Sequence, residues 1–218
     1  MSADSSAKAL KYLQDLGVKV LLNSRVEAFD GRVVTLDDGR TIASQKVIWA
    51  AGIKGMPLPG LPEEAITYGN RLAVDRFNRV KGTENVYALG DVSYMEEPDF
   101  PKGHPQVAQV AIQMGEHLAK NLRYRHLRGE EWEPFHYNDK GSMATIGRAR
   151  AVVDIPKPEF HFGGLLAWLV WLLVHLFAIL GTRNKIFVFL NWLYNYINYN
   201  QSLRLIIRPR TLPEVSEK

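Results

Sequence analysis

The chain has 218 residues, 46% of them hydrophobic, and so carries enough apolar side chains to bury at least one core. Its formal charge of +4 comes from basic residues scattered along the chain, which argues against a nucleic-acid-binding surface. It contains no cysteine, so disulfides, thiolate metal sites and cysteine redox chemistry within the chain are excluded, and a reducing compartment fits.

The first 52 residues predict a helix followed by a small sheet. Residues 4–16 carry four leucine and alanine side chains on one helical face, which ends at Gly17. The predicted strands are residues 18–23, 25–30, two runs within 32–44, and 46–52. A D-D-G turn at 37–39 predicts a hairpin inside the third segment.

The middle of the chain predicts a second strand unit and a helix. Prolines and glycines make 53–70 a linker, residues 72–91 form the strand unit, and a helix runs from about 106 to 124. The stretch N-V-Y-A-L-G-D ends at Gly90 and Asp91, where a hydrophobic strand is expected to stop. Ligands of doubly wound folds bind beyond the carboxyl ends of strands, so Asp91 is a candidate acceptor for ligand hydroxyls. The alternative is a turn or helix-capping aspartate.

The segment H-P-Q-V-A-Q-V-A-I-Q-M-G, residues 104–115, begins the predicted helix. Pro105 suits the first turn of a helix, whose free backbone N–H groups would point back toward the strand ends. A helix N-terminus stabilises negative charge, such as that on a reduced flavin.

The last third of the chain predicts two membrane-associating helices. Residues 162–181 contain no Lys, Arg, Asp or Glu and are long enough to cross a bilayer. The helix after Lys185 has an apolar face opposite Asn191, Asn195 and Asn198, as in a helix that lies in the membrane interface. The amphipathic second helix favours a hydrophobic platform that lies in one leaflet. The alternative is a buried core helix with an amphipathic cover.

The chain resembles the type II NADH dehydrogenases, the single-subunit NADH:quinone oxidoreductases that do not pump protons. Four segments carry the resemblance in order: W-A-A-G at 49–52, N-V-Y-A-L-G-D at 85–91, A-Q-x-A-x-Q at 108–113, and a hydrophobic tail ending in N-Q-S-L-R-L-I-I. Sulfide:quinone oxidoreductases share this scaffold, but their chemistry depends on cysteines near the flavin. A soluble ferredoxin or disulfide reductase would leave residues 162–207 without a role.

The resemblance implies an α/β fold, the C-terminal part of a flavoprotein with two dinucleotide-binding domains and partial Rossmann-like units, plus the membrane-associating tail. It assigns residues 1–60 to the NADH-binding domain and 61–130 to the FAD-binding domain. Residues 131–158 become a small β segment of the C-terminal domain, and 159–218 become the helical tail.

The resemblance also implies the site residues. FAD is expected at Gly90, Asp91, Gln109, Val110, Ala111 and Lys140. NADH is expected at Trp49, Ala50, Ala51 and Gly52, and quinone at Gln109 and Gln113. Without the family, the two glutamines would read as a solvated helix face, Lys140 as a turn lysine and 49–52 as a packed strand end. The six histidines lack the spacing of metal ligands.

The implied reaction takes a hydride from NADH to the flavin and passes two electrons and protons to a membrane quinone. No side chain need act as a nucleophile, because the flavin carries the chemistry. The expected location is the cytoplasmic face of the inner (plasma) membrane, as a peripheral or monotopic protein that contacts lipid through 162–207, and a homodimer is one expected assembly.

The chain lacks the glycine-rich loops that are typical of the family. A complete member has two G-x-G-x-x-G loops that cradle pyrophosphates, and this sequence has no G-x-G spacing at all. We therefore expect a C-terminal fragment or truncated gene product that is inactive alone. The alternative function is that of a noncatalytic membrane-associated or interaction protein derived from the same scaffold.

Overall fold

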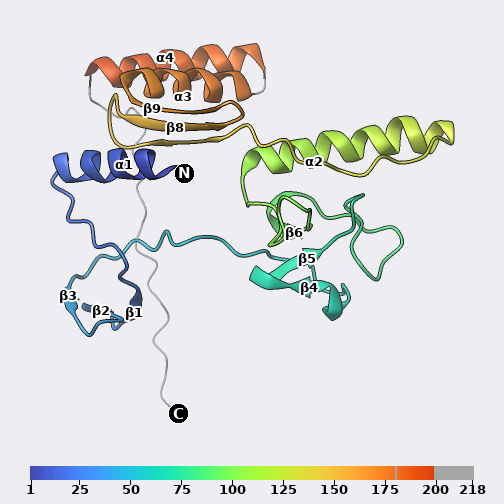
Figure 1. The fold of residues 1–218 in the computed structure, drawn as a ribbon, viewed down its shortest axis with the longest axis horizontal. Coiled ribbons are helices and arrows are strands. Elements are labelled where there is room, and N and C mark those ends of the chain that lie inside the picture. The colour runs from blue at the N-terminus through green and yellow to red at the C-terminus, as the bar shows by residue number, and fades with distance from the viewer. Residues whose placement is uncertain (180, 199–218) are drawn as a thin grey trace. The chain divides into compact units, whose positions relative to one another are not determined.

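The computed structural model describes residues 1–179 and 181–198 (Figure 1). They divide into two compact units. The first unit is formed by residues 1–19 and 142–155 and by the described residues from 159 onward. The second is formed by residues 20–141 and 156–158. The mixture of helices and sheets confirms the predicted α/β class. The predicted division into domains at residues 1–60, 61–130, 131–158 and 159–218 stays a prediction.

The first unit is built on a three-stranded sheet. Its strands, in the order β7–β8–β9, are β7 (Ser142–Thr145), β8 (Ala151–Pro156) and β9 (Glu159–Gly164). Helix α1 (Ala3–Asp15) contacts β9, and helix α3 (Leu165–Ala178) contacts β7 and β9. In Figure 1 α1 and α3 lie on opposite sides of the sheet, and α4 (Thr182–Asn198) lies against α3.

Helix α1 confirms the predicted first helix and begins after a serine cap, Ser2. The Ser2 hydroxyl accepts the N–H of Ser5 at 3.1 Å, which satisfies one free amide of the first turn. The Asp154 carboxylate of β8 accepts the Ser2 N–H at 2.5 Å and the Ser5 hydroxyl at 2.5 Å. This polar cluster therefore ties the start of α1 to the sheet.

The two predicted tail helices are present, but the first begins later than predicted, at Leu165, and the second begins earlier, at Thr182. Residues 159–164 form β9 because they extend the hairpin from β8 rather than continuing into the apolar helix. Helix α3 then covers 14 residues and α4 covers 17. Within residues 1–179 and 181–198, no helix has both the length and the apolar character needed to span a membrane. The N-Q-S-L-R-L-I-I end of the predicted tail lies outside the described residues.

The second unit contains two small sheets. In the first, β1 (Val26–Phe29), β2 (Val33–Leu36) and β3 (Thr41–Ala43) pair antiparallel, and Val34 of β2 lies opposite Ile42 of β3. The predicted D-D-G turn is confirmed between β2 and β3, because the Leu36 N–H donates to the Arg40 carbonyl at 2.9 Å. Gly39 adopts a φ of 81°, which suits glycine at this turn.

The second sheet has the order β4–β5–β6. It consists of β4 (Ile66–Thr67), β5 (Arg71–Ala73) and β6 (Ser93–Tyr94), with β4 and β5 antiparallel and β5 and β6 parallel. Three short 3-10 turns accompany these strands: Glu63–Ala65, Tyr68–Asn70 and Gly90–Val92.

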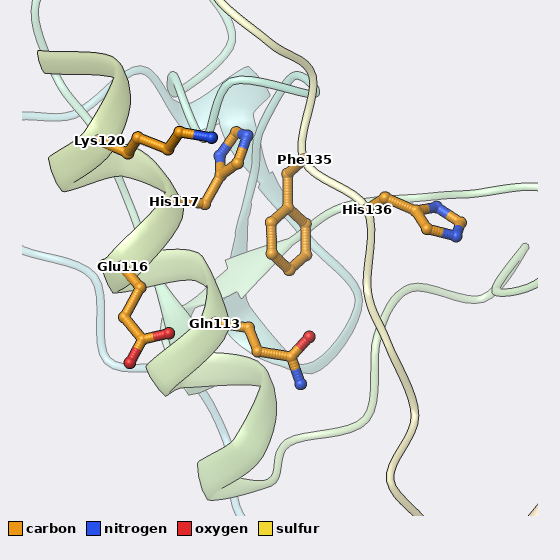
Figure 2. Close-up of a pocket in the computed structure, with 6 residues that line it drawn as sticks. All are labelled: Gln113, Glu116, His117, Lys120, Phe135 and His136. Atoms are coloured by element: carbon orange, nitrogen blue, oxygen red, sulfur yellow. The ribbon is translucent and has the colours of Figure 1, made fainter. Parts of the chain in front are cut away.

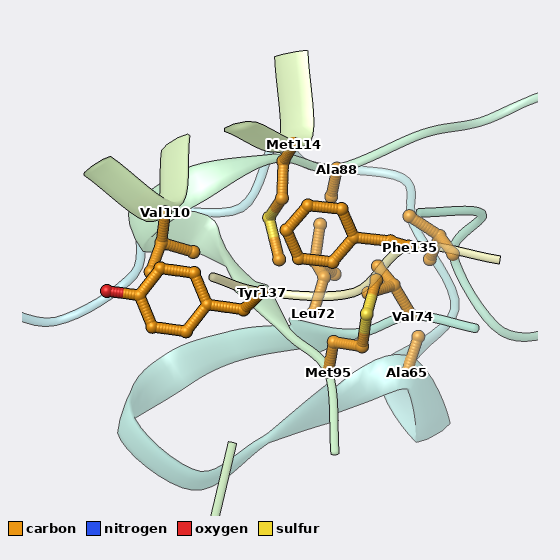
Figure 3. Close-up of a cluster of buried hydrophobic side chains, with 10 residues drawn as sticks. Ala65, Leu72, Val74, Ala88, Met95, Val110, Met114, Phe135 and Tyr137 are labelled. Atoms are coloured by element: carbon orange, nitrogen blue, oxygen red, sulfur yellow. The ribbon is translucent and has the colours of Figure 1, made fainter. Parts of the chain in front are cut away.

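The predicted central helix is confirmed as α2 (Ala108–Lys120), which continues as a π-helical stretch over Asn121–His126. Its buried side chains Val110, Met114 and Leu118 recur every four residues, as expected for a helix with one face on a core. Figure 3 shows the core that forms there. Its buried members are Ala65, Leu72, Val74, Val80, Ala88, Met95, Val110, Met114, Phe135 and Tyr137.

Three predicted strands are wrong. Residues 18–23 and 46–52 form no strand, and 85–91 forms only a single bridge, between Tyr87 and Arg79, before the turn at Gly90. Apolar strands of a parallel sheet are stable only between paired neighbours that cover both faces. In the part of the chain that the structure describes, no strand pairs with 18–23 or 46–52, and Ile48 is 93% exposed.

Candidate functional site

Gly90 joins the turn Gly90–Val92 closely to α2. It is buried and has a φ of 63°, a conformation that favours glycine. A Cβ atom at this position would lie 2.8 Å from the Cβ of Ala111. The Gly90 N–H also points at the sulfur of Met114, at 3.4 Å. The close neighbour of Gly90 is therefore a helix of the protein itself.

Asp91 follows at the surface. Its backbone carbonyl accepts a hydrogen bond from the side-chain amide of Gln106 at 2.9 Å, which anchors the backbone of this turn. Its side chain is exposed, and the carboxylate has no hydrogen-bond or ion-pair partner among residues 1–179 and 181–198. A carboxylate held in this way can accept hydrogen bonds from a ligand's hydroxyl groups.

The first turn of α2 lies against the same turn of chain. Val107 is the N-cap residue, and no side chain caps the helix. The Val110 N–H donates back to the Val107 carbonyl at 3.1 Å. The amides that precede it belong to the orphan donors of a helix start, where the helix dipole is positive. Asp91 and the first turn of α2 therefore offer an acceptor and a set of donors on neighbouring segments, since the Gly90–Val92 turn packs against α2.

Gln109 holds the segment that carries Lys140. Its side-chain amide donates to the carbonyl of Gly141 at 2.9 Å and accepts the Lys140 N–H at 3.1 Å. The side-chain N–H and C=O groups of Gln109, a residue predicted to contact both flavin and quinone, thus both form hydrogen bonds to the protein backbone. The structure brings two predicted FAD residues together, because Gln109 fixes the backbone at Lys140.

Gln113 and Asn121 repeat this arrangement further along the helix. Gln113 donates to the Asn138 carbonyl at 2.9 Å and accepts the Asn138 N–H at 3.0 Å. Asn121 donates to the Glu133 carbonyl at 3.0 Å and accepts the Glu133 N–H at 3.2 Å. Three amide side chains of one helix therefore hold the extended segment 133–141, as a neighbouring strand would. We call this set the amide ladder. The Gln-x-x-x-Gln spacing was its only signal in the sequence.

The turn at Lys140 is fixed from a second side. The Asp139 carboxylate accepts the Gly141 N–H at 2.8 Å and lies 3.5 Å from the Tyr137 hydroxyl. Burial, together with Asp139, raises the pKa of Tyr137 to about 12, so the hydroxyl keeps its proton at neutral pH. Lys140 itself is exposed.

An open pocket of about 260 Å³ lies beside the amide ladder (Figure 2). It is lined by Gln113, Glu116, His117, Lys120, Phe135 and His136. Figure 2 shows Gln113 reaching from α2 toward the segment that carries Phe135 and His136.

The predicted NADH residues Trp49–Gly52 are not joined to this site. They lie in a stretch without regular structure, where Trp49 is 66% exposed. Among the described residues, no hydrogen bond links them to Asp91, α2 or Lys140. Their role stays a prediction.

The amide ladder can be tested by substitutions on α2 that change the free energy of unfolding. We expect Gln113→Ala to destabilise the protein by about 1–2 kcal/mol, because it removes two hydrogen bonds of about 0.5–1.5 kcal/mol each from a partly buried side chain. Glu116→Ala is the matched control. Among the described residues, this exposed α2 side chain makes no hydrogen bond to the 133–141 backbone, so we expect a change within about 0.5 kcal/mol. Urea unfolding followed by circular dichroism measures both, and equal effects would contradict the ladder.

Two family models match the chain. Residues 1–115 match the pyridine nucleotide-disulphide oxidoreductase family, and residues 140–198 match the NDH2 C-terminal domain. The chain belongs to the pyridine nucleotide-disulphide oxidoreductase family. The relatives confirm the resemblance to type II NADH:quinone oxidoreductases that the sequence motifs predict.

Two curated relatives illustrate the match. The type II NADH:quinone oxidoreductase Ndh of Mycobacterium tuberculosis is 35% identical over 214 residues, which cover 91% of this chain and 43% of that protein. The internal alternative NAD(P)H-ubiquinone oxidoreductase A1 of Arabidopsis thaliana mitochondria is 30% identical over 209 residues, covering 87% and 40%. The chain thus spans about two fifths of the length of these relatives.

Two solved structures share the fold. NDH2 of Plasmodium falciparum, solved in complex with NADH, superimposes with a TM-score of 0.77 at 18% identity, over 89% of this chain and 55% of that one. The sulfide:quinone oxidoreductase of Aquifex aeolicus gives a TM-score of 0.56 at 15% identity, over 92% and 47%. At such identities the likeness concerns the fold alone.

Proposed function

We propose that this chain is part of a flavoprotein NADH:quinone oxidoreductase that passes electrons from NADH through FAD to a membrane quinone. The observation that carries the proposal is the exposed Asp91 carboxylate, which lies beside the uncapped start of α2 and has no hydrogen-bond or ion-pair partner among residues 1–179 and 181–198. The relatives support it, because the two described above are named for this reaction or its ubiquinone form.

The residues of the second unit fit a bound FAD. Asp91 would accept hydrogen bonds from the ribityl hydroxyls, and Gly90 keeps that turn against α2. The backbone at Gln109, Val110 and Ala111 would face the flavin ring, where the helix start stabilises negative charge. Lys140 would bring a positive charge to the same place, since Gln109 holds its backbone. When bound, FAD accepts a hydride and passes on two electrons.

The remaining substrate residues are proposed from the family alone. Trp49–Gly52 would lie near the nicotinamide, and Gln109 and Gln113 near the quinone. Because both glutamine side chains bind the 138–141 backbone, we propose that they shape the quinone pocket mainly by holding that segment. The chain has no G-x-G spacing and spans about two fifths of the length of its relatives. We therefore propose the activity for a larger assembly that contains this chain, and not for the chain alone.

The helices α3 and α4 would bind the membrane. They expose large apolar side chains over most of their length, among them Leu166, Leu173, Phe177, Phe187, Leu190 and Ile197. Arg183 and Lys185 lie at the start of α4, where they can attract anionic headgroups. A peripheral attachment fits this arrangement. The cytoplasmic face and a homodimer stay predictions.

The experiment measures flavin in the assembly that the affinity-tagged chain brings with it from the membranes of its source cells, because the chain is expected to be inactive alone. We expect bound FAD, bleached by NADH and reoxidised by a quinone. Asp91→Ala should bind FAD about 10-fold to 100-fold more weakly, because a hydrogen bond to a charged group is worth about 1.5–3 kcal/mol. Asp99→Ala, an exposed aspartate of the same region, should bind normally.

Two results would contradict the proposal. Purified protein that contains no flavin but binds vesicles would support the noncatalytic membrane-associated alternative. Flavin content unchanged by Asp91→Ala would show that this carboxylate does not hold the cofactor.

A further inference from the structure

Glu97 is a buried carboxylate in the second unit that the proposed reaction does not use. It follows β6, and its side chain has no exposed surface. Three groups able to carry positive charge surround it. Its oxygens lie 3.2 Å from Arg76 Nη2, 3.3 Å from His104 Nε2 and 3.1 Å from His136 Nδ1.

These contacts depend on charge rather than on well-directed hydrogen bonds. Neither oxygen of Glu97 meets hydrogen-bond geometry, although all three distances are within reach of an ion pair. His104 is itself buried. Burial lowers its pKa, Glu97 opposes that shift, and Arg76 and Arg71 add to it. Arg76 is therefore the permanent positive partner. An amide in place of the carboxylate would keep the shape of Glu97 but lose most of this attraction.

One neighbour of Glu97, His104, lies in the segment that leads into α2. His104 lies four residues before the first residue of α2, next to Pro105, and its ring packs edge-on against Phe100 and Phe135. Its backbone carbonyl accepts the Arg71 guanidinium at 3.0 Å. Both the ring and the carbonyl of His104 are therefore fixed, and with them the start of the helix.

The other two neighbours control the extended segment 133–141. His136 belongs to this segment, between the buried Phe135 and Tyr137. Arg76 donates a hydrogen bond to the Phe135 carbonyl, and its own carbonyl accepts the Phe135 N–H at 2.6 Å. Glu97 thus contacts this segment directly at His136 and, through Arg76, is linked to the backbone of Phe135.

A buried carboxylate is expensive unless its partners compensate, and removing one member of a buried pair is strongly destabilising. The partners that compensate the buried charge of Glu97 come from two places, the segment before α2 and the region around the 133–141 segment. We propose that Glu97 is a positioning residue that holds the α2 entry at His104 and the 133–141 segment at Arg76 and His136, and so sets the place of Lys140 beside the first turn of α2. The consequence for flavin rests on the proposed function, whereas the positioning itself does not.

The test is amide hydrogen exchange in the full chain without cofactor, read by NMR at Asn138 and Lys140. Their N–H groups donate to Gln113 and Gln109, so they report whether the segment is held. Glu97→Gln should speed exchange at both amides by about tenfold or more, because local opening becomes easier. Glu96→Gln, the exposed neighbouring glutamate, should change it by less than about twofold. Unchanged exchange at Lys140 in Glu97→Gln would overturn the proposal.

Two further measurements separate positioning from loss of the fold. The amide of Met114, a fully buried residue of α2, should keep its slow exchange in Glu97→Gln. An equal increase at Met114 and Lys140 would mean global destabilisation and would overturn the proposal. His104→Gln combined with Glu97→Gln should be less than additive, because the two residues share one contact, whereas full additivity would show independent roles. None of these readouts depends on flavin, so a failure of the proposed function leaves them unchanged.

Discussion

Gly90→Ala is expected to destabilise the protein by about 2–5 kcal/mol. The left-handed backbone costs an alanine about 1–2 kcal/mol, and overpacking a close contact costs about 1–3 kcal/mol more. The new methyl group would meet the Cβ of Ala111 at 2.8 Å, so the Gly90–Val92 turn and α2 would have to separate. The separation would also displace Asp91, so flavin binding in the purified protein should fall together with stability.

Gly115→Ala is the matched control on α2. At Gly115 the backbone is helical, and a Cβ atom would meet nothing within 4 Å. We expect this change to stabilise the protein by about 0.5–1 kcal/mol, because alanine loses less conformational entropy than glycine in a helix. Thermal and urea unfolding of the two variants measure the change in the free energy of unfolding, which should be opposite in sign for Gly90→Ala and Gly115→Ala. Destabilisation by both to a similar extent would show that the contact between Gly90 and Ala111 is not decisive.

Replacing two exposed apolar residues of α3 should abolish most vesicle binding. Phe177 is 71% exposed and Leu173 is 50% exposed, so neither is needed to fill the core of the unit. Inserting such a side chain into a membrane is worth about 1.5–3 kcal/mol. The variant Leu173→Asp/Phe177→Asp should therefore bind vesicles of phosphatidylcholine and phosphatidylglycerol at least about 100-fold more weakly. Sedimentation with vesicles measures the partition.

The control adds the same two negative charges elsewhere. Gln14→Glu/Gln45→Glu changes two exposed polar side chains outside the tail helices and should lower binding only slightly, through electrostatic repulsion. If both double variants lost binding equally, net charge rather than the apolar surface of α3 and α4 would hold the protein at the membrane. If neither did, the proposed membrane contact would be wrong.

The sequence by itself determined the features that depend on local periodicity and turn chemistry. Helix α1, the hairpin turn at 37–39, helix α2 and the pair α3 and α4 were all predicted from the spacing of apolar residues and from glycine. The motifs also predicted the family, because N-V-Y-A-L-G-D and A-Q-x-A-x-Q occur in order within one chain. Such signals lie within a few residues of one another, so a linear reading can find them.

Only the tertiary structure decided which apolar runs become strands and which polar residues meet. Residues 46–52 have strand composition but no strand pairs with them in the described chain, while the less apolar 159–164 become β9 because β8 precedes them. Gln109 meets Lys140 and Glu97 meets His136 across more than 30 residues of sequence. Contacts of this range depend on how the chain folds back on itself. Spacing predicted that Gln109 and Gln113 share a face, and the fold showed that this face holds the backbone of 138–141.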